Sequence, residues 1–495
     1  MTRVEPIEGR EKHFFGHPRG LSTLFFTELW ERFSYYGMRA ILVLFMTAAV
    51  VDGGMGLNTV RATAIYGLYT ASVYLLALPG GWVADRLLGQ RHAVFLGGSI
   101  IAAGHFSMAI PATPTFYLGL FLIVIGTGLL KPNVSAIVGD LYTAEEGERR
   151  DAGFSIFYMG INLGALVGPL ICGTLGERVN WHLGFSAAGI GMVFGLIQYR
   201  LGGAFLGSAG MLRDEARETR GAALRTLMLG ILGVVGLTLA VYLLGRTGII
   251  GITVEGVADA TGYIIVSLAV LYFMYVLSFG HLATPEKKRV IVIFFLFLGA
   301  ALFWSGFEQA GSSMNLFARD LTDRVVLGWE HPASWYQSVN PIFIVLLAPV
   351  FGWLWVTLGS RSPSLPVKFG LGLALLGVGF FVIAWGASFA TPENPVSPMW
   401  LVVMYFLHTT GELCLSPVGL SSVTKLSPKK LVGQMMGIWF MGAALGNLIA
   451  GRLAGQFESM SPSQLFFWVA VIAGGSGVVF FLASRPIKKL MGGVH

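Results

Sequence analysis

Apolar segments of about 20 residues or more follow one another along almost the whole chain of 495 residues. A membrane-spanning helix needs about 20 predominantly apolar residues, so the chain has room for many spans. Charged residues make up 12% of the sequence, whereas soluble domains usually carry roughly 25%. These numbers exclude a soluble enzyme and a disordered chain, and they predict an all-α polytopic membrane protein.

Charged or Pro/Gly-rich breaks divide the apolar sequence into fourteen predicted transmembrane helices, and no loop between them is long enough for a soluble domain. The predicted limits are 22–51, 60–84, 92–111, 115–142, 152–176, 181–201, 222–245, 260–281, 290–318, 334–358, 367–389, 397–424, 431–456 and 463–484. The polar stretch 213–225 is expected to form a short amphipathic segment on the membrane surface.

The distribution of Lys and Arg predicts the orientation of these spans. With the N-terminus inside, 24 of the 33 Lys and Arg residues fall in inner loops and termini, six on the outer side and three within spans. An excess of positive residues in short loops marks the cytoplasmic side. We therefore expect both termini in the cytoplasm, and we assign the net charge of +7 to inner loops rather than to a nucleic-acid site.

Few ionisable residues lie inside the predicted spans, and such residues are costly and usually functional. They are Glu28, Glu31, Arg32, Arg39, Lys131, Glu308 and Glu412. When the apolar spans 222–245 and 260–281 are set aside, the charged spans are the first, fourth, seventh and tenth of the remaining twelve. Each then opens a three-helix unit, as in transporters built from nested repeats. The alternative reading is a set of buried structural ion pairs.

The first span carries a polar stripe of Glu28, Glu31, Arg32, Tyr35 and Arg39. At 3.6 residues per turn their offsets of 0, 3, 4, 7 and 11 place them on one face of a helix. A face this polar is expected to line a wet cavity rather than to contact lipid. Carboxylates beside arginines gain or lose a proton as their partners leave or return, which gives a physical basis for proton coupling.

Four segments resemble signatures of the proton-coupled oligopeptide transporters, a family of the major facilitator superfamily. They are Glu28 to Gly37, Phe157 to Gly164, Phe307 to Ser312 and Gly411 to Pro417. The loop from Gly81 to Arg91 is similar to the inner loop of major facilitator transporters. The resemblance implies two six-helix bundles plus two extra helices, which are typical of prokaryotic members, and hence a multi-pass protein of a prokaryotic plasma (inner) membrane. The expected parts are an N-terminal bundle (1–205), a linker with the extra helices (206–288) and a C-terminal bundle (289–495).

The same resemblance implies a role for each matched residue. Proton coupling would depend on Glu28, Glu31, Arg32 and Glu308. Peptide binding would involve Arg32, Arg39, Tyr35, Tyr36, Tyr74, Lys131, Asn162, Trp304, Asn340, Glu412, Ser416 and Trp439. Two ion pairs would act as gates, Arg39 with Glu308 on the outer side and Lys131 with Glu412 on the inner side.

A zwitterionic di- or tripeptide suits these residues, because cations on the first and fourth helices and an acid on the tenth offer a partner to each end. The expected function is proton-driven import of peptides by alternating access. The expected partners are the peptide and membrane lipid, with no nucleic acid, no obligatory protein partner, no metal and no cofactor besides the transported proton. No enzymatic activity is expected. The alternatives are a carrier of the same fold for another small anion (nitrate, a dicarboxylate or a conjugated metabolite) and a non-transporting nutrient sensor.

Overall fold

The computed structural model describes residues 12–143, 145–247 and 251–493. The predicted cytoplasmic termini fall on residues 1–11 and 494–495, outside the described residues. Helices dominate the described chain, and the only strands among these residues form two short antiparallel hairpins. The strands are β1 (Lys12–Phe14), β2 (His17–Pro18), β3 (Val325–Val326) and β4 (Trp329–Glu330).

The helices follow the apolar segments of the sequence. The α-helices are α1 (Gly20–Thr47), α2 (Thr59–Val83), α3 (Gln90–Met108), α4 (Thr113–Asp140), α5 (Gly147–Arg178), α6 (Trp181–Leu201), α7 (Asp214–Arg246), α8 (Val254–Phe279), α9 (Thr284–Phe307), α10 (Ser313–Asp320), α11 (Val339–Leu358), α12 (Leu365–Ala387), α13 (Met399–Leu426), α14 (Val432–Ala454), α15 (Pro462–Leu482) and α16 (Ser484–Met491). Shorter helical turns are η1 (Val50–Asp52), η2 (Ala84–Leu88), η3 (Gly202–Leu206), η4 (Glu308–Gly311), η5 (Ala333–Ser338), η6 (Gly359–Arg361), η7 (Lys429–Leu431) and η8 (Gly455–Phe457).

The all-α membrane fold class is confirmed, with one correction to a predicted segment. Twelve helices of the described residues are long and apolar enough to cross a membrane, and α1 and α3 occupy the two other predicted span positions. The predicted span 290–318 falls within one of these twelve, Thr284–Asp320, in which the tight turn η4 separates α9 from α10. The predicted surface segment 213–225 is wrong, because these residues lead into and form the first turns of the long helix α7.

The described residues pack as two compact units, each treated separately below. Unit 1 consists of the described parts of Met1–Met38 and Leu75–Val257, and unit 2 of the described parts of Arg39–Tyr74 and Ala258–His495. The end of α1 and the first half of α2 therefore pack with unit 2. Of the two extra helices, α7 belongs to unit 1, and α8 belongs to unit 2 from Ala258 onward. The sequence-based division at 205 and 288 stays a prediction.

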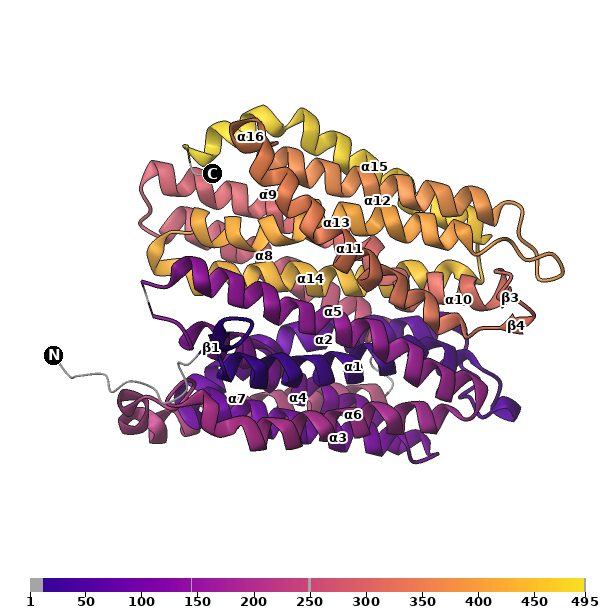
Figure 1. Ribbon diagram of the computed structural model, residues 1–495, viewed down its shortest axis with the longest axis horizontal. Coiled ribbons are helices and arrows are strands. Elements are labelled where there is room, and N and C mark those ends of the chain that lie inside the picture. The colour runs from indigo at the N-terminus through magenta and orange to yellow at the C-terminus, as the bar shows by residue number, and fades with distance from the viewer. Residues whose placement is uncertain (1–11, 144, 248–250, 494–495) are drawn as a thin grey trace. The chain divides into compact units, whose positions relative to one another are not determined.

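Glycines bring the helices of unit 1 into close contact. Helices α3, α4 and α6 lie side by side (Figure 1), and α3 meets α4 through Gly97, Gly104, Gly119 and Gly126. A methyl group at Gly97 would lie 2.6 Å from the carbonyl oxygen of Gly126, and one at Gly104 would lie 2.9 Å from that of Gly119. Small residues permit such close approach of membrane helices, which accounts for the glycines at this interface.

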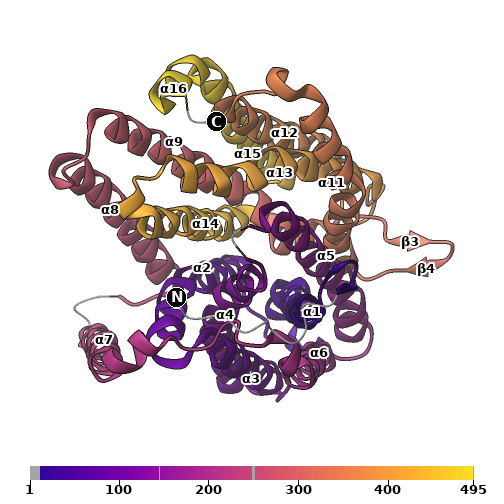
Figure 2. The ribbon, with the colours of Figure 1, turned by 60° about the vertical axis from the view of Figure 1, so that its left-hand side comes forward.

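Unit 2 is built around α12, which packs between α13 and α15 (Figure 2). Helix α8 contacts this unit through an ion pair between Arg452 and Asp259, with 2.7 Å between Nε and Oδ1, and through a 2.7 Å hydrogen bond from Tyr272 to Gln434. The apolar window of α7 is 0% buried, against 22% for that of α8. Of the two extra helices, α7 is therefore the more exposed.

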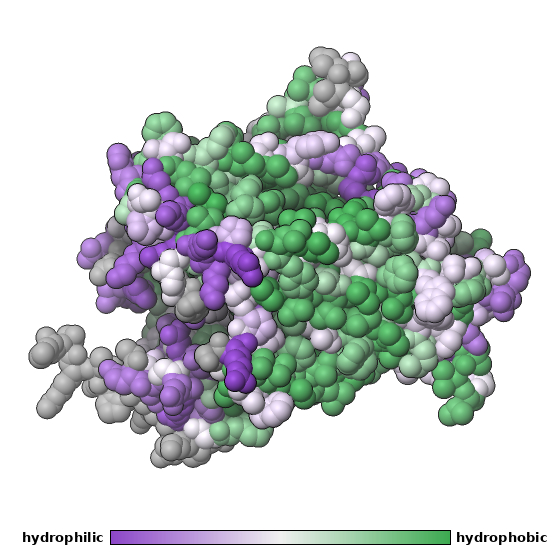
Figure 3. Space-filling view, turned by 90° about the horizontal axis from the view of Figure 1, so that it is seen from above, coloured by the Kyte–Doolittle hydropathy of each residue, from purple (hydrophilic) through white to green (hydrophobic). Residues whose placement is uncertain are grey.

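The exposed surface has the polarity of a membrane protein. Figure 3 shows a broad hydrophobic surface between hydrophilic residues gathered toward its left and right ends. Large apolar side chains are exposed along α7, as at Leu232, Val234 and Leu237. Water does not stabilise such a surface, so the hydrophobic band is the part that lipid covers.

Candidate functional site

The charged stripe of α1 forms a buried cluster in unit 1. The Nε atom of Arg32 donates a hydrogen bond to Glu31 and forms an ion pair with Glu28, whose Oε1 lies 3.2 Å away. All three residues are at most 3% exposed. One oxygen of each carboxylate has no hydrogen-bond partner in the described residues. Two buried carboxylates thus share a single guanidinium, which makes the cluster sensitive to protonation.

Aromatic and basic groups surround this cluster. The guanidinium carbon of Arg32 lies 5.2 Å from the ring centre of Tyr35 and 5.9 Å from that of Tyr36. Lys131 on α4 is half-buried and interacts electrostatically with Glu28. Unit 1 therefore brings together six residues that the sequence predicted for binding and proton coupling.

Asn162 on α5 is the remaining predicted residue of unit 1. Its side-chain amide donates to the carbonyl of Tyr158, one turn earlier on the same helix, at 2.9 Å. This local bond uses one of the two N–H donors of the amide, and the role of Asn162 in peptide binding stays a prediction.

Unit 2 contains the second predicted ion pair. Arg39 Nη1 lies 2.9 Å from Glu308 Oε2, and the two side chains are 7% and 5% exposed. Glu308 is the first residue of η4, so the turn between α9 and α10 carries this carboxylate. The ring of Tyr66 packs near Arg39, with 6.0 Å between the guanidinium carbon and the ring centre. This pair joins the last part of α1 to the end of α9.

A polar group on α11 and α13 contains two more predicted residues. The amide of Asn340 donates to Glu412 Oε2 at 3.1 Å and to the hydroxyl of Thr409 at 2.9 Å. Ser416 lies one turn after Glu412 on α13 and is half-buried. Glu412 and Lys131 belong to different units, so their predicted gating pair stays a prediction.

The predicted aromatic residues of unit 2 have different surroundings. Trp439 is 7% exposed and packs against Gly419 and Phe369. Trp304 lies against Gly446, where a methyl group would come within 2.6 Å of its Cβ. Both tryptophans thus occupy helix interfaces, whereas Tyr74 on α2 is half-buried.

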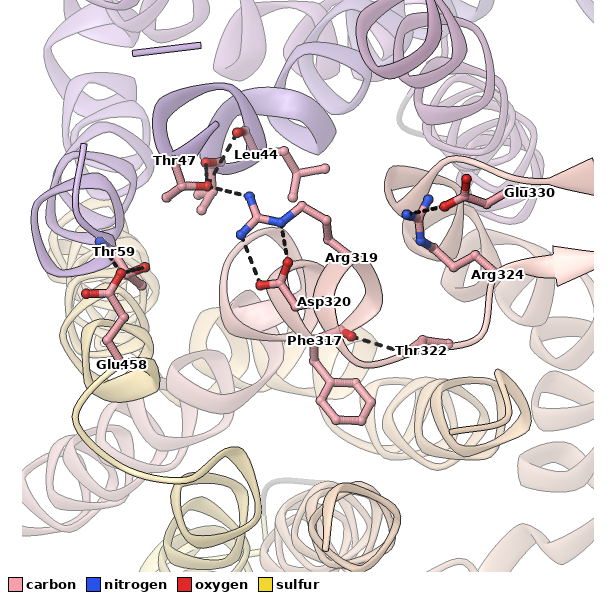
Figure 4. Close-up of polar contacts among 11 residues, drawn as sticks. Leu44, Thr47, Thr59, Phe317, Arg319, Asp320, Thr322, Arg324, Glu330 and Glu458 are labelled. Atoms are coloured by element: carbon pink, nitrogen blue, oxygen red, sulfur yellow. Dashed lines mark hydrogen bonds and ion pairs between the residues drawn. The ribbon is translucent and has the colours of Figure 1, made fainter. Parts of the chain in front are cut away.

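Two contacts at the end of α1 and the start of α2 did not emerge from the sequence (Figure 4). Arg319, on the last turn of α10, donates at 2.8 Å to the hydroxyl of Thr47, the last residue of α1, and it pairs in a bidentate manner with Asp320. Glu458, after η8, accepts hydrogen bonds from both the amide and the hydroxyl of Thr59, the first residue of α2. Both contacts join a helix end to a distant part of the chain within unit 2. No local pattern in the sequence signals the first contact, because Arg319 and Thr47 are 272 residues apart.

In the part of the chain that the structure describes, no group of three or more His, Cys, Asp and Glu side chains is arranged to hold a metal ion. The two cysteines, Cys172 and Cys414, are buried and unbonded.

Comparison with known proteins agrees with the family resemblance found in the sequence. The model of the POT family matches residues 91–469. The chain is 42% identical to a peptide transporter of Yersinia enterocolitica, over 97% of this chain and 96% of that protein. It is 39% identical to a di-/tripeptide transporter of Lactococcus lactis, over 99% of this chain and 100% of that protein. A crystal structure of a peptide transporter POT in complex with sulfate matches with a TM-score of 0.89 and 42% identity, over 98% of each chain. The resemblance found in the sequence is thereby confirmed, and the chain belongs to the POT family.

Proposed function

We propose that this chain imports di- and tripeptides in symport with protons by alternating access. The observation that carries the proposal is the buried cluster on α1, in which Glu28 and Glu31 share Arg32. The relatives named as peptide transporters support the substrate class. We also propose that the protein lies in a prokaryotic plasma membrane with cytoplasmic termini and carries out no covalent chemistry.

In the proposed cycle, the peptide carboxylate binds Arg32 and Lys131. A substrate carboxylate on Arg32 replaces Glu31, and Glu31 then takes up a proton because a buried carboxylate without its counter-charge is unstable in the charged form. Proton uptake and peptide binding are thereby linked. Neither step requires a metal or a covalent intermediate.

The amino end of the peptide is proposed to bind the polar group on α11 and α13. Glu412 supplies a negative charge, and Asn340 already orients it by a 3.1 Å hydrogen bond. An ammonium group has three N–H donors, and Glu412 and the oxygen of Asn340 together accept hydrogen bonds from them. The tyrosines Tyr35, Tyr36 and Tyr74 supply walls that tolerate different side chains.

Two gates are proposed to open in turn. Protonation of Glu308 removes the charge that holds Arg39, and removing one partner of a buried ion pair costs about 3–5 kcal/mol. That energy is enough to destabilise the paired arrangement at one end of the transporter. At the other end, release of the peptide accompanies opening of the proposed pair between Lys131 and Glu412.

The test is uptake of labelled dialanine into proteoliposomes whose interior is alkaline. We expect accumulation that disappears when the pH gradient is collapsed. The variant Glu31→Gln is expected to lose gradient-driven accumulation but to retain exchange of labelled for unlabelled peptide. The exposed Glu393→Gln serves as the control that retains both. Accumulation of nitrate or succinate but not of dialanine would overturn the peptide assignment, and loss of exchange in Glu31→Gln would assign this residue to binding or folding.

A further inference from the structure

A groove of about 340 Å³ lies in unit 1 between the start of α1, the last turns of α6 and η3. It belongs to neither the cluster on α1 nor the other predicted sites. Its lining contains one cation, Arg19, and no carboxylate. The groove therefore has the electrostatic character of a site for an anion.

Arg19 is held in position at the head of this groove. Its guanidinium carbon lies 3.7 Å from the ring centre of Phe205, on η3, a distance at which cation–π attraction is effective. A guanidinium stacked by its face keeps its N–H groups in the plane of the group, where they can donate to a phosphate in a bidentate manner. Ser22 adds a hydroxyl to the same wall.

The floor of the groove is closed by tight packing. The hydroxyl of Thr23 donates to the carbonyl of Gly202 at 3.2 Å, and a methyl group at Gly202 would lie 2.3 Å from that hydroxyl oxygen. Thr27 donates to Gln198 at 3.2 Å one turn deeper. These contacts fix α1 against α6, so the groove keeps its form without a ligand.

An apolar strip leads away from Arg19 along α6. Ile190, Phe194, Ile197 and Leu201 are 48%, 50%, 51% and 77% exposed, and their spacing places them on one face of the helix. They extend over roughly 16 Å at 1.5 Å per residue. That length is about half of the roughly 30 Å hydrocarbon core of a bilayer and so matches one leaflet.

We propose that this groove binds an anionic phospholipid of the leaflet that contacts the start of α1. Its phosphate lies on Arg19, and one acyl chain follows the strip on α6. Basic pockets between membrane helices bind anionic headgroups, and a free phosphate would have no use for the apolar strip. Because Arg19 directly precedes α1 and Leu201 ends α6, the charged end of the groove lies at the level where headgroups are found.

The test is native mass spectrometry of the full-length transporter in neutral detergent, titrated with dioleoylphosphatidylglycerol or dioleoylphosphatidylcholine. We expect the wild type to prefer the anionic lipid by about fivefold, the effect of one basic residue near a headgroup. Arg19→Gln is expected to lose this preference, and Arg19→Lys to keep most of it. Arg200→Gln removes a nearby exposed charge of α6 that does not line the groove, and it is expected to behave as wild type.

Two further measurements separate the lipid from a soluble anion and from a folding defect. Ile197→Gln is expected to weaken lipid binding, and sn-glycerol 3-phosphate is expected not to displace the lipid. Each variant is compared by its elution as a single species and by its melting temperature. An unchanged lipid preference in folded Arg19→Gln, or displacement of the lipid by glycerol phosphate, would overturn the proposal.

Discussion

Glu458 offers a direct way to measure what holds the end of α1 and the start of α2 against the other helices of unit 2. Its carboxylate accepts from the amide of Thr59 at 3.1 Å and from the Thr59 hydroxyl (Figure 4). The first amides of a helix have no partner within the helix, so this carboxylate acts as a cap supplied from a distant part of the chain. The negative charge is also favourable at the positive end of the helix dipole.

The variant Glu458→Ala removes both effects. Loss of a capping side chain costs about 0.5–2 kcal/mol, and an exposed charge at a helix N-terminus contributes about 0.3–1 kcal/mol. Because the carboxylate is partly solvated, we take about 1 kcal/mol for the whole change, which corresponds to about fivefold in an equilibrium constant. The separated arrangement of these helix ends is therefore expected to be about fivefold more populated in the variant.

The assay measures how fast a buried cysteine reacts with a maleimide reagent. Ala40 is suitable because it is 0% exposed and its carbonyl accepts from Asn315 at 2.7 Å, so Ala40→Cys reacts only when the helix ends separate. The native cysteines are replaced by serine. We expect Glu458→Ala to raise the labelling rate about fivefold, and the exposed-loop control Glu393→Ala to leave it unchanged.

An unchanged labelling rate in Glu458→Ala would refute the capping argument, provided that Glu308→Gln raises the rate in the same background. That second variant removes the buried partner of Arg39. It therefore shows that the cysteine reports separation of the helix ends.

Three other predictions concern different parts of the chain. Arg39→Gln or Glu308→Gln alone is expected to lower stability by about 3–5 kcal/mol, and the double variant is expected to recover part of that loss. The melting temperatures of the wild type, the two single variants and the double variant measure this, and additive losses would contradict a direct pair. Gly97→Ala is expected to cost about 1–3 kcal/mol by overpacking, whereas Gly230→Ala, which meets no atom within 4 Å, should leave or raise the melting temperature; equal effects would contradict the packing argument. Burial lowers the pKa of His17 from its ordinary value of 6.5. The contribution of His17 to stability is therefore complete above about pH 6.5 and is lost as the pH falls toward the lowered pKa. Hydrogen exchange of the His17 segment, corrected for intrinsic rates, should rise on acidification in the wild type and should not rise in His17→Gln.

The helices were predictable because the bilayer imposes a length and a composition on each of them. The break at η4 was not predictable in the same way. Residues 290–318 lie within one candidate span, Thr284–Asp320, and the turn η4 inside it places Glu308 beside Arg39. Likewise, residues 213–225 look like a surface segment by composition, whereas the helix simply continues through them as α7.

The predicted site residues differ in how far the sequence located them. Glu28, Glu31 and Arg32 lie three and four residues apart, so helix geometry alone predicted their cluster. The resemblance to the family implied that Trp304 and Trp439 line the peptide pocket, and this role stays a prediction. The structure places Trp439 against Gly419 and Phe369, and the Cβ of Trp304 against Gly446. Residue type does not show which face of a membrane helix is covered by another helix.

The sequence by itself determined the membrane class, the helix positions, the polar stripe of α1 and the family, because each of these depends on composition or on spacing along one helix. Only the tertiary structure decided that Arg319 meets Thr47, that Glu458 caps α2 and that Arg19 stands over Phe205 at the head of an apolar groove. These contacts join residues that are between about 180 and 400 positions apart. Their formation depends on how whole helices pack, and no local pattern along the chain records that packing.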